Sequence, residues 1–391
     1  MSKLTLVATA TFGLEAVVKR EIEALGYPVL RSEDARILYT GDERALVRSN
    51  LWLRSADRVL LLMGEFTAKT FEELFQQTKA LPWEEWIPMD GKFPVEGVSV
   101  KSTLHSVPDC QAIVKKAVVE RLKETYGIQR FPETGANYAI KVSILKDRVS
   151  LTMDTSGPGL HKRGYRVRDV AAPIKETLAA AMVQLSFWKE GRLLVDPCCG
   201  SGTIPIEAAM IAKNIAPGLG RKFASEGWEA VPAHLWKEER KAAFAAMDYD
   251  KDVRIRAFDI DERAIKAAAI NAREAGVDDC IEFRVLPVQR LHEVLESEGG
   301  AEPYSIMIAN PPYGERIGEK KEIREIYKAL TAFFSQEPTW SLYLVTSDKE
   351  FEKLFREKPA DRRRKLYNGR LEICYYQYYG LKPPRKEQEE A

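Results

Sequence analysis

The sequence predicts an α/β fold in which a parallel sheet is closed by an antiparallel hairpin and preceded by two small α+β units. Three observations support this prediction. The chain has 391 residues, enough for two or three domains at roughly 100–200 residues each. After residue 171, short apolar runs alternate with helical patterns. Near the end, Asn368-Gly369 separates two strand-like runs, which is typical of a hairpin.

The chain before residue 156 predicts the two small α+β units. Residues 1–63 follow the order strand, helix, strand, strand, helix, strand, in which Gly26 ends the first helix and Asp42 caps the second. Residues 64–155 contain a helix at 110–126 and, after it, two alternating runs that indicate a half-buried hairpin.

A breaker cluster separates these units from the rest of the chain. Ser156 to Gly159 reads SGPG, and residues 161–168 read HKRGYRVR, with four lysines and arginines and no acid. We therefore expect a basic linker at 156–170, a third domain at 171–382 and a polar tail at 383–391.

The third domain has the alternating pattern of an α/β sheet. Its elements are expected as helix 173–189, strand 193–196, helix 203–212, strand 254–259, helix 262–275, strand 281–285, strand 305–310, helix 321–335, strand 342–346, and a terminal hairpin of 365–367 with 371–378. Helical crossovers between strands predict parallel pairing. The stretch between the first two strands, including 214–223, is interpreted as an insertion.

The composition excludes several classes of protein. With 45% hydrophobic and 30% charged residues, the chain is neither disordered nor a membrane bundle, and its start lacks a signal-peptide pattern. We therefore expect a soluble, cytoplasmic protein without a membrane partner. Five cysteines without CxxC spacing and four scattered histidines predict no disulfide framework and no metal site. Because the net charge is only +1, any nucleic-acid surface must be local.

A candidate ligand-binding loop follows the strand that ends near Val195. The sequence from Asp196 to Thr203 reads DPCCGSGT, and a helix begins directly after it. Gly200 and Gly202 let the backbone approach a ligand closely, while the free N–H groups of the helix start attract an anionic group. A purely structural turn needs the same glycines, so this motif alone does not decide between the two interpretations.

An acidic residue, Asp259, follows the next strand in the run FDID. An acid at this position is placed to accept hydrogen bonds from ribose hydroxyls, although a solvated helix-capping Asp fits the same pattern. Its separation from Gly202 exceeds the roughly 20 residues of a dinucleotide-binding fingerprint, which is consistent with the insertion.

The turn Asn310-Pro311-Pro312-Tyr313 follows an apolar strand. The Asn310 amide and the next backbone carbonyl can both accept hydrogen bonds from one planar NH₂ group, and the Tyr313 ring offers a face for stacking. A diproline turn alone is commonly structural. Its position after the fourth strand of a sheet that already carries the two other motifs favours a clamp that aims an amine nitrogen at a methyl donor.

Together these motifs resemble those of the THUMP-containing class I methyltransferases, most closely the bacterial 23S ribosomal RNA guanine-N2 methyltransferase group. The resemblance rests on DPCCGSGT, FDID, NPPYGERIG and the lead-in GLHKRGYR…APIKETLAAAM, and it covers nearly the whole chain. It implies a Rossmann-like methyltransferase fold for the third domain, a ferredoxin-like domain at 1–63 and a THUMP RNA-binding domain at 64–155.

The resemblance further implies S-adenosylmethionine as cofactor and assigns its site. The cofactor-binding residues would be Thr177, Asp196, Cys199, Gly200, Ser201, Gly202 and Asp259, with Asp259 on the ribose. Asn310, Pro311, Pro312 and Tyr313 would hold the target amine. Many relatives carry an acid for the adenine amino group where this chain reads VLPV at 285–288, so adenine recognition there is left to backbone groups.

The implied function is methylation of an exocyclic amine of RNA, namely guanine N2 of 23S ribosomal RNA or of an assembly intermediate. Adenine N6 of DNA or RNA, guanine N2 of tRNA, a glutamine amide of a protein, and a non-catalytic RNA-binding scaffold stay open as alternatives. Two basic runs are candidate RNA contacts or, equally, solvated faces. They are Lys162, Arg163, Arg166 and Arg168, and the residues 362–365. The tyrosines between 375 and 379 are interpreted as core and rim.

Overall fold

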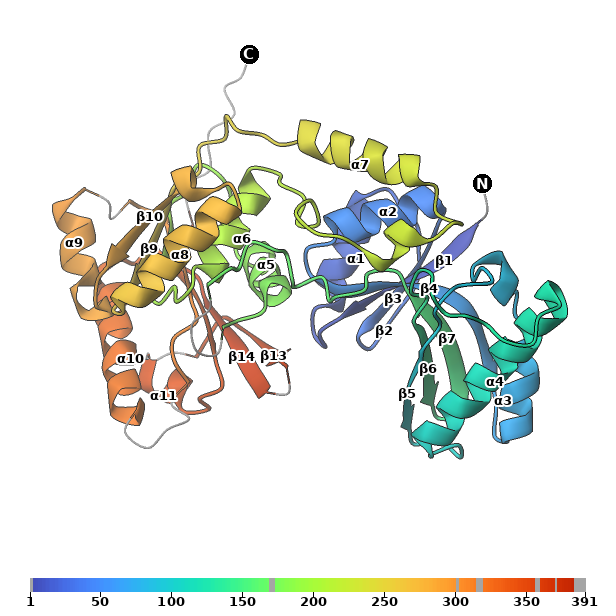
Figure 1. Cartoon of the computed structure of the whole chain (residues 1–391). Helices are drawn as coiled ribbons and strands as arrows, with labels where there is room; N and C mark the ends of the chain where they lie inside the picture. The colour runs from blue at the N-terminus through green and yellow to red at the C-terminus, as the bar shows by residue number, and fades with distance from the viewer. Residues whose placement is uncertain are drawn as a thin grey trace, which may run out of the picture. The chain divides into compact units, whose positions relative to one another are not determined.

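The computed structural model describes residues 3–168, 173–299, 302–313, 319–355, 359–369 and 371–382. The chain divides into two compact units (Figure 1). The first comprises Met1–Ala10, Val18–Lys162 and Ala216–Ala245, and the second comprises Thr11–Val17, Arg163–Ile215 and Ala246–Ala391. Each unit contains its own seven-stranded sheet.

The sheet of the first unit has the strand order β2-β3-β1-β4-β7-β6-β5. Its strands are β1 (Leu4–Ala10), β2 (Val29–Glu33), β3 (Arg36–Gly41), β4 (Ala56–Thr67), β5 (Val95–Val100), β6 (Ile140–Leu145) and β7 (Arg148–Asp154). All neighbouring strands are antiparallel except β5 and β6. The predicted strand and helix order of the first 63 residues and the predicted hairpin are therefore confirmed.

Strand β4 is shared by the two parts of this sheet. It pairs with β1 between Ala56 and Leu61, and with β7 between Leu60 and Thr67. The expected boundary between residues 63 and 64 falls inside this strand, next to a bulge between Leu62 and Gly64. The two small α+β units predicted from the sequence therefore share one continuous sheet.

Several helices are associated with this sheet, and two of their ends were predicted from the sequence. They are α1 (Glu15–Ala24), α2 (Glu43–Trp52), α3 (Phe71–Lys79), α4 (Val107–Tyr126) and α7 (Ala233–Ala245). Asp42 caps α2, because its side chain accepts a hydrogen bond from the Ala45 N–H at 2.8 Å. Gly26 follows α1 with φ of +87°, a conformation that favours glycine.

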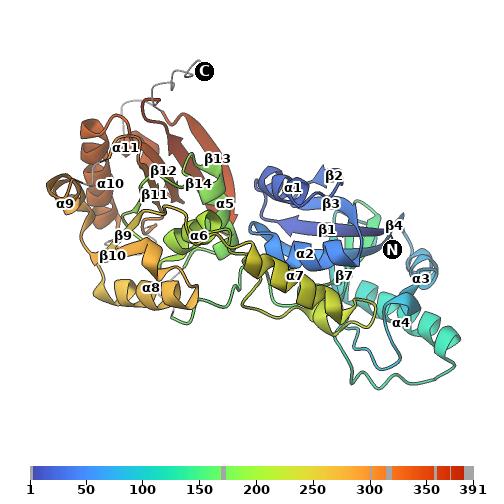
Figure 2. The ribbon, with the colours of Figure 1, turned by 90° about the horizontal axis from the view of Figure 1, so that it is seen from above.

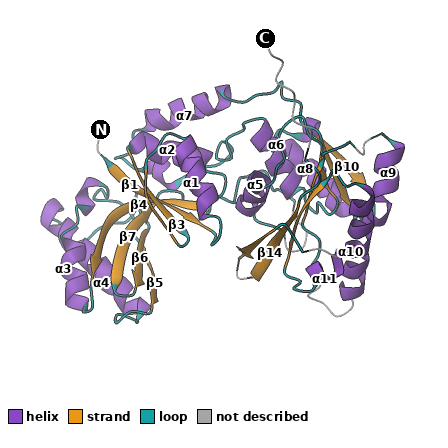
Figure 3. Ribbon diagram, turned by 180° about the vertical axis from the view of Figure 1, so that it is seen from behind, coloured by secondary structure: helices purple, strands orange, loops and turns teal. Residues whose placement is uncertain are grey.

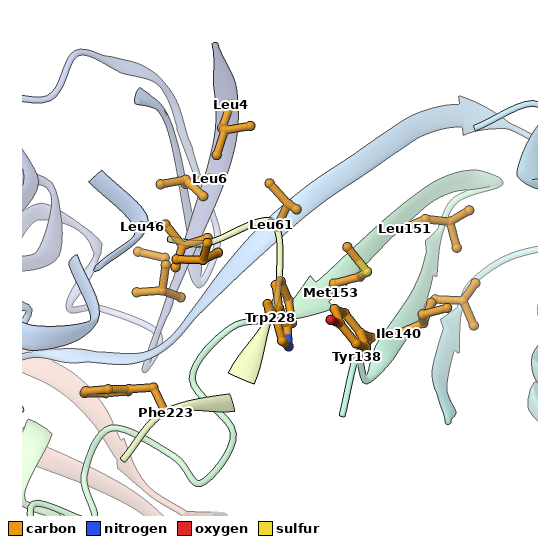
Figure 4. Close-up of a cluster of buried hydrophobic side chains, with 14 of the residues drawn as sticks. Leu4, Leu6, Leu46, Leu61, Tyr138, Ile140, Leu151, Met153, Phe223 and Trp228 are labelled. Carbon is orange, nitrogen blue, oxygen red and sulfur yellow. The ribbon is translucent and has the colours of Figure 1, made fainter. Parts of the chain in front are cut away.

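The segment Ala216–Ala245 belongs to the first unit, although the sequence places it within the 171–382 domain. Its rings complete the apolar core of that unit (Figure 4): Trp228 is buried and stacks on Tyr138 at 4.9 Å, and Phe223 stacks on Trp236 at 5.1 Å. Helix α7 lies beside α2 in both views (Figure 2), where Arg44 pairs with two glutamates of α7. The local pattern gave no sign that these rings would pack on a distant sheet.

The sheet of the second unit has the strand order β10-β9-β8-β11-β12-β14-β13. Its strands are β8 (Leu194–Asp196), β9 (Ile255–Asp259), β10 (Ile281–Val285), β11 (Ile306–Ala309), β12 (Ser341–Thr346), β13 (Arg362–Asn368) and β14 (Leu371–Tyr378). The first five in this order are parallel, and β14 and β13 are antiparallel to their neighbours. The predicted parallel sheet closed by an antiparallel hairpin is confirmed.

Helices flank this second sheet (Figure 3). They are α5 (Glu176–Leu185), α6 (Thr203–Ala212), α8 (Glu262–Glu274), α9 (Leu291–Ser297), α10 (Glu319–Gln336) and α11 (Phe351–Phe355). Among the elements predicted for this unit, two differ most in length: the helix expected at 173–189 is shorter, and the strand expected at 365–367 is longer. The backbone of Ser186, beyond α5, is extended with ψ of 175°, which ends the helix there.

The segment Thr11–Val17 belongs to the second unit, in spite of its early place in the chain. Gly13 has φ of +91°, and a Cβ there would lie 2.7 Å from the Lys365 carbonyl oxygen. The Phe12 ring meets the Tyr367 ring edge-on at 6.3 Å. Only a glycine permits this close approach to β13. Together with Ala216–Ala245, this segment means that each unit contains a piece of chain that lies, in sequence order, within the other unit.

We predict that a shortened chain beginning at Arg163 folds poorly when it retains residues 216–245. The shortening removes the sheet on which Trp228 and Trp236 are buried, and it leaves these rings exposed to water. Thermal unfolding and binding of a hydrophobic dye, compared with the full chain, measure the effect.

A matched variant of the shortened chain replaces 216–245 by a short glycine-serine linker. The ends of the segment are close together, since the Asp248 N–H donates to the Lys213 carbonyl at 2.9 Å. We expect this variant to bind less dye and unfold more cooperatively. Equal behaviour of both shortened chains would contradict the packing role of the segment.

Candidate active site

The loop after β8 begins at a carboxyl group in an unusual environment. Asp196 is fully buried, and its Oδ1 accepts a hydrogen bond from the Cys198 N–H at 3.1 Å. Its other oxygen, Oδ2, has no hydrogen-bond partner among the described residues. Burial raises the pKa of this carboxyl well above its ordinary value. Burying an oxygen without a hydrogen-bond partner costs free energy of folding, so this position suits a ligand that donates a hydrogen bond.

Two glycines give the loop its shape. Gly200 and Gly202 have φ of +54° and +85°, the left-handed region that other residues rarely adopt. Gly202 directly precedes α6, and a Cβ there would lie 3.0 Å from the Ala268 Cβ of α8. The loop is thus packed tightly against α8, and the N–H groups at the start of α6 lie beside it.

Asp259, at the end of β9, holds the loop directly. Its Oδ2 accepts a hydrogen bond from the Gly200 N–H at 2.9 Å, and its Oδ1 accepts one from the Asp261 N–H at 2.9 Å. The two motifs meet because β8 and β9 are parallel neighbours whose carboxyl ends share one edge of the sheet. Each carboxylate oxygen keeps a further lone pair, so the carboxylate can still accept a ligand hydroxyl.

The turn at 310–313 follows β11, which is the parallel neighbour of β8 on the side opposite β9. The turn therefore lies at the same edge of the sheet as the glycine loop. Asn310 is half-buried, Pro311 is buried and Pro312 is exposed. The Tyr313 hydroxyl donates a hydrogen bond to the Asn310 Oδ1 at 2.7 Å. The tyrosine expected as a stacking platform therefore also fixes the orientation of the asparagine amide.

The remaining predicted cofactor residues have different surroundings. Cys199 is buried, its N–H donates to the Phe258 carbonyl at 2.8 Å, and burial raises the pKa of its thiol well above the ordinary value. Ser201 is buried in the loop. Thr177 is buried in the first turn of α5, and its predicted contact with the donor stays a prediction.

Part of the linker interpreted as a possible RNA contact is in fact buried structure. Arg163 and Glu207 form an ion pair at 3.2 Å with both side chains buried, and the Tyr165 hydroxyl donates to Glu207 at 3.1 Å. Arg166 is bound to Glu176 of α5 at 2.9 Å and to the Thr203 hydroxyl of α6 at 3.0 Å. Neither arginine lies on a solvated face, and of this run only Lys162 and Arg168 are exposed.

The second basic run, at 362–365, forms ion pairs with nearby acids, whereas three of the tyrosines after it are buried. Arg363 pairs with the half-buried Glu352 at 2.8 Å, and Lys365 pairs with the exposed Glu372 at 2.6 Å. The tyrosines at 375, 376 and 378 are buried, which confirms their interpretation as core and excludes them as stacking platforms.

Sequence reasoning missed two residues at this edge. Asn271 of α8 is fully buried and hydrogen-bonds to the loop. Ile260, directly after Asp259, is 74% exposed, so its large aliphatic side chain is available to cover the face of a flat ring. The signals were present: an asparagine within an alanine-rich helical face, and a solvated isoleucine between two aspartates.

A cavity of about 480 Å³ lies elsewhere and does not belong to this site. Its lining includes Arg254, Ile281 and Glu302, at the amino ends of the strands, whereas the loops above follow their carboxyl ends. No helix in the described ranges is long and apolar enough to cross a membrane. The described residues also contain no group of three metal-ligating side chains.

Comparison with known proteins identifies the family. The model of the RMKL-like methyltransferase domain matches residues 163–377. The chain belongs to this family. Models of the RlmL ferredoxin-like domain and of the THUMP domain match residues 5–60 and 68–154. The resemblance noted from the motifs is thereby confirmed, while the finer boundaries expected from the sequence stay predictions.

Similar proteins extend this finding. The RMKL-like chain is 49% identical over 394 residues to the putative RNA methyltransferase YpsC of Bacillus subtilis, with 100% of both chains covered. It is 33% identical to the ribosomal RNA large subunit methyltransferase K/L of Syntrophotalea carbinolica, over 97% of this chain and 55% of that protein. The chain therefore spans about half the length of the K/L relative.

Solved structures show the same fold. A predicted N6-adenine-specific DNA methylase from Listeria monocytogenes is 49% identical, with a TM-score of 0.91 and 97% of each chain covered. The putative methyltransferase SMU.472, complexed with S-adenosylhomocysteine, is 42% identical, with a TM-score of 0.90, covering 98% of this chain and 100% of that one.

This RMKL-like protein is thus an S-adenosylmethionine-dependent RNA methyltransferase with a class I methyltransferase fold. Its residues fit that cofactor. The Asp196 Oδ2, which has no partner among the described residues, suits a hydrogen-bond donor of the cofactor. The left-handed glycines leave the backbone open to a ligand beside the start of α6.

We predict that Asp259→Ala weakens S-adenosylmethionine binding by about 1–3 kcal/mol, the cost of leaving a hydrogen-bonding group without its partner. The change removes the predicted ribose acceptor and also releases the Gly200 N–H. Titration calorimetry on the full chain measures the affinity.

Asp261→Ala is the matched control, because Asp261 caps α8 through the Arg263 N–H at 2.8 Å and its side chain is not predicted to contact the donor. This control should lower the melting temperature and leave the affinity unchanged. Unaltered donor affinity in a folded Asp259→Ala protein would remove Asp259 from the site.

Proposed function

We propose that this enzyme methylates the N2 amine of a guanine in large-subunit ribosomal RNA, with the 310–313 turn as the amine clamp. The observation that carries the proposal is that Asn310 follows β11, the strand next to the glycine loop. The printed name of the K/L relative supports ribosomal RNA of the large subunit as the acceptor.

The donor half of the site comprises the loop and its neighbours. Bound S-adenosylmethionine supplies a methyl group on a positively charged sulfur. The residues that hold the cofactor in this proposal are Thr177, Asp196, Cys199, Gly200, Ser201, Gly202 and Asp259. The buried Asp196 Oδ2 would accept from the ammonium group of the donor, which would favour the ionised carboxylate and offset its burial.

The acceptor half comprises the 310–313 turn. Asn310 Oδ1 has two lone pairs, of which the Tyr313 hydroxyl uses one and the substrate NH₂ would use the other. The Pro311 carbonyl would accept the second N–H, and the two proline rings hold the turn rigid. The amine nitrogen would then be aligned to take the methyl group as the carbon–sulfur bond breaks, with S-adenosylhomocysteine as the leaving group and the amine proton passing to water. In this proposal the protein orients the amine rather than acting as a nucleophile.

Adenine N6 is the second candidate acceptor, since the Listeria relative is named a predicted N6-adenine-specific DNA methylase. An exocyclic amine of adenine would fit the same pair of acceptors. The THUMP domain match at 68–154 favours RNA over DNA. Family membership and the intact loop argue against the non-catalytic scaffold.

We predict that Asn310→Ala leaves donor binding intact and lowers the methylation rate roughly 100-fold or more, the effect of lost positioning in the transition state. Single-turnover rates at saturating donor measure it, with folding checked by circular dichroism. Tyr313→Phe keeps the ring and loses the bond to Asn310, so it should be less harmful than Tyr313→Ala. Near wild-type turnover by Asn310→Ala would return the turn to a structural role.

Nucleoside mass spectrometry tests the acceptor. In cells that lack this protein, we expect one N2-methylguanosine to disappear from 23S ribosomal RNA and to return with the wild-type gene but not with Asn310→Ala. Loss of an N6-methyladenosine, or of a modified guanosine in tRNA, would overturn the guanine or the ribosomal assignment respectively.

A further inference from the structure

We propose that Asn271 is a positioning residue that couples the linker to the cofactor loop and thereby sets the affinity for S-adenosylmethionine. The inference rests on the assignment of the Gly200–Gly202 loop to the donor. It gives residues 163–168 a role in donor binding that is separate from any contact with RNA.

Asn271 uses its whole side-chain amide to join the two segments. Its Oδ1 accepts hydrogen bonds from the Val167 and Arg168 N–H groups, both at 3.1 Å. Its Nδ2 donates to the Arg168 carbonyl at 2.9 Å and to the Ser201 carbonyl at 3.1 Å. One fully buried side chain thus binds the backbone of the linker and the backbone of the loop.

The same face of α8 also fixes the loop by packing. Ala268 lies one helical turn before Asn271, and a Cβ on Gly202 would lie 3.0 Å from its Cβ. The loop therefore packs against the small Ala268 side chain and hydrogen-bonds to the Asn271 side chain one helical turn later. Two independent contacts of one helix determine where the loop backbone lies.

The linker is itself held firmly enough to act as a support. Arg163 is anchored to Glu207 of α6, and Arg166 bridges Glu176 and Thr203 at the first turns of α5 and α6. These anchors lie on both sides of the loop in the sequence and do not belong to it. The loop is thus positioned between α8 and an anchored backbone segment.

Removing the amide would leave four backbone groups without their partner, including the Ser201 carbonyl inside the loop. The groups must then shift or bind water, and either outcome removes the restraint on the backbone that would contact S-adenosylmethionine. Because the reacting amine is oriented by the 310–313 turn instead, the chemical step at saturating donor should be little affected. The expected signature is a change in donor affinity without a matching change in kcat.

The test uses the full chain with Asn271→Ala. We expect the dissociation constant for S-adenosylhomocysteine, measured by calorimetry, and the KM for S-adenosylmethionine both to rise about tenfold. The kcat at saturating donor and the KM for RNA should stay within about twofold of wild type. If Asn271→Ala does not fold, Asn271→Ser, which keeps one donor and one acceptor, serves the same comparison.

Asn50→Ala is the matched control. Asn50 is also buried, and its amide makes hydrogen bonds to Leu46, Thr155 and Ser156 within the first unit. This variant should lower the melting temperature and leave the donor affinity unchanged. Equal effects of both variants on donor affinity would mean that Asn271 acts only through stability, and would overturn the inference.

The Asp259→Ala protein separates this inference from the site assignment. If Asp259→Ala weakens donor binding and Asn271→Ala does not, the loop assignment stands and the positioning role of Asn271 fails. If neither variant changes donor affinity, the assignment of the loop to the donor fails, and the inference fails with it.

Discussion

The buried ion pair between Arg163 and Glu207 fixes where the methyltransferase unit begins. Both side chains are almost completely removed from water, and each charge alone would cost several kcal/mol to bury. The two must therefore stay together, which holds the linker against α6. Because α6 directly follows Gly202, the same pair also restrains the helix next to the glycine loop. The Asn271 amide and the Arg166 bridge extend this restraint to α8 and α5.

The fold and most of the proposed site could be predicted because each signal is local. A strand pattern followed by DPCCGSGT, by FDID or by NPPY places its polar residues at the carboxyl end of that strand, and a parallel sheet gathers those ends at one edge. The conformation of Gly202 and the cap at Asp42 follow from residues within a few positions of them. No knowledge of the distant chain was needed for any of these.

The burial of Arg163 and Arg166 in the linker could not be predicted, because it depends on partners far along the chain. A run of basic residues looks the same whether it is solvated or paired, and the partner of Arg163 lies 44 positions away. A signal was present in α6, whose sequence TIPIEAAMIA holds a single acid among apolar residues. A lone charge in a buried helix needs an opposite charge, and Arg163 provides it. The packing of residues 216–245 could not be predicted either, since the sequence does not indicate against which sheet their aromatic rings pack.

The exchange of segments between the units has a consequence for synthesis on the ribosome. The core of the first sheet is incomplete until Trp228 and Trp236 are available, so the N-terminal unit cannot finish folding when its own strands have emerged. More than half of the chain, including β8 and α6 of the other sheet, leaves the ribosome first. The first sheet therefore cannot mature before part of the second sheet has been synthesised. A nascent chain arrested before residue 245 would present an unfinished core to chaperones and proteases.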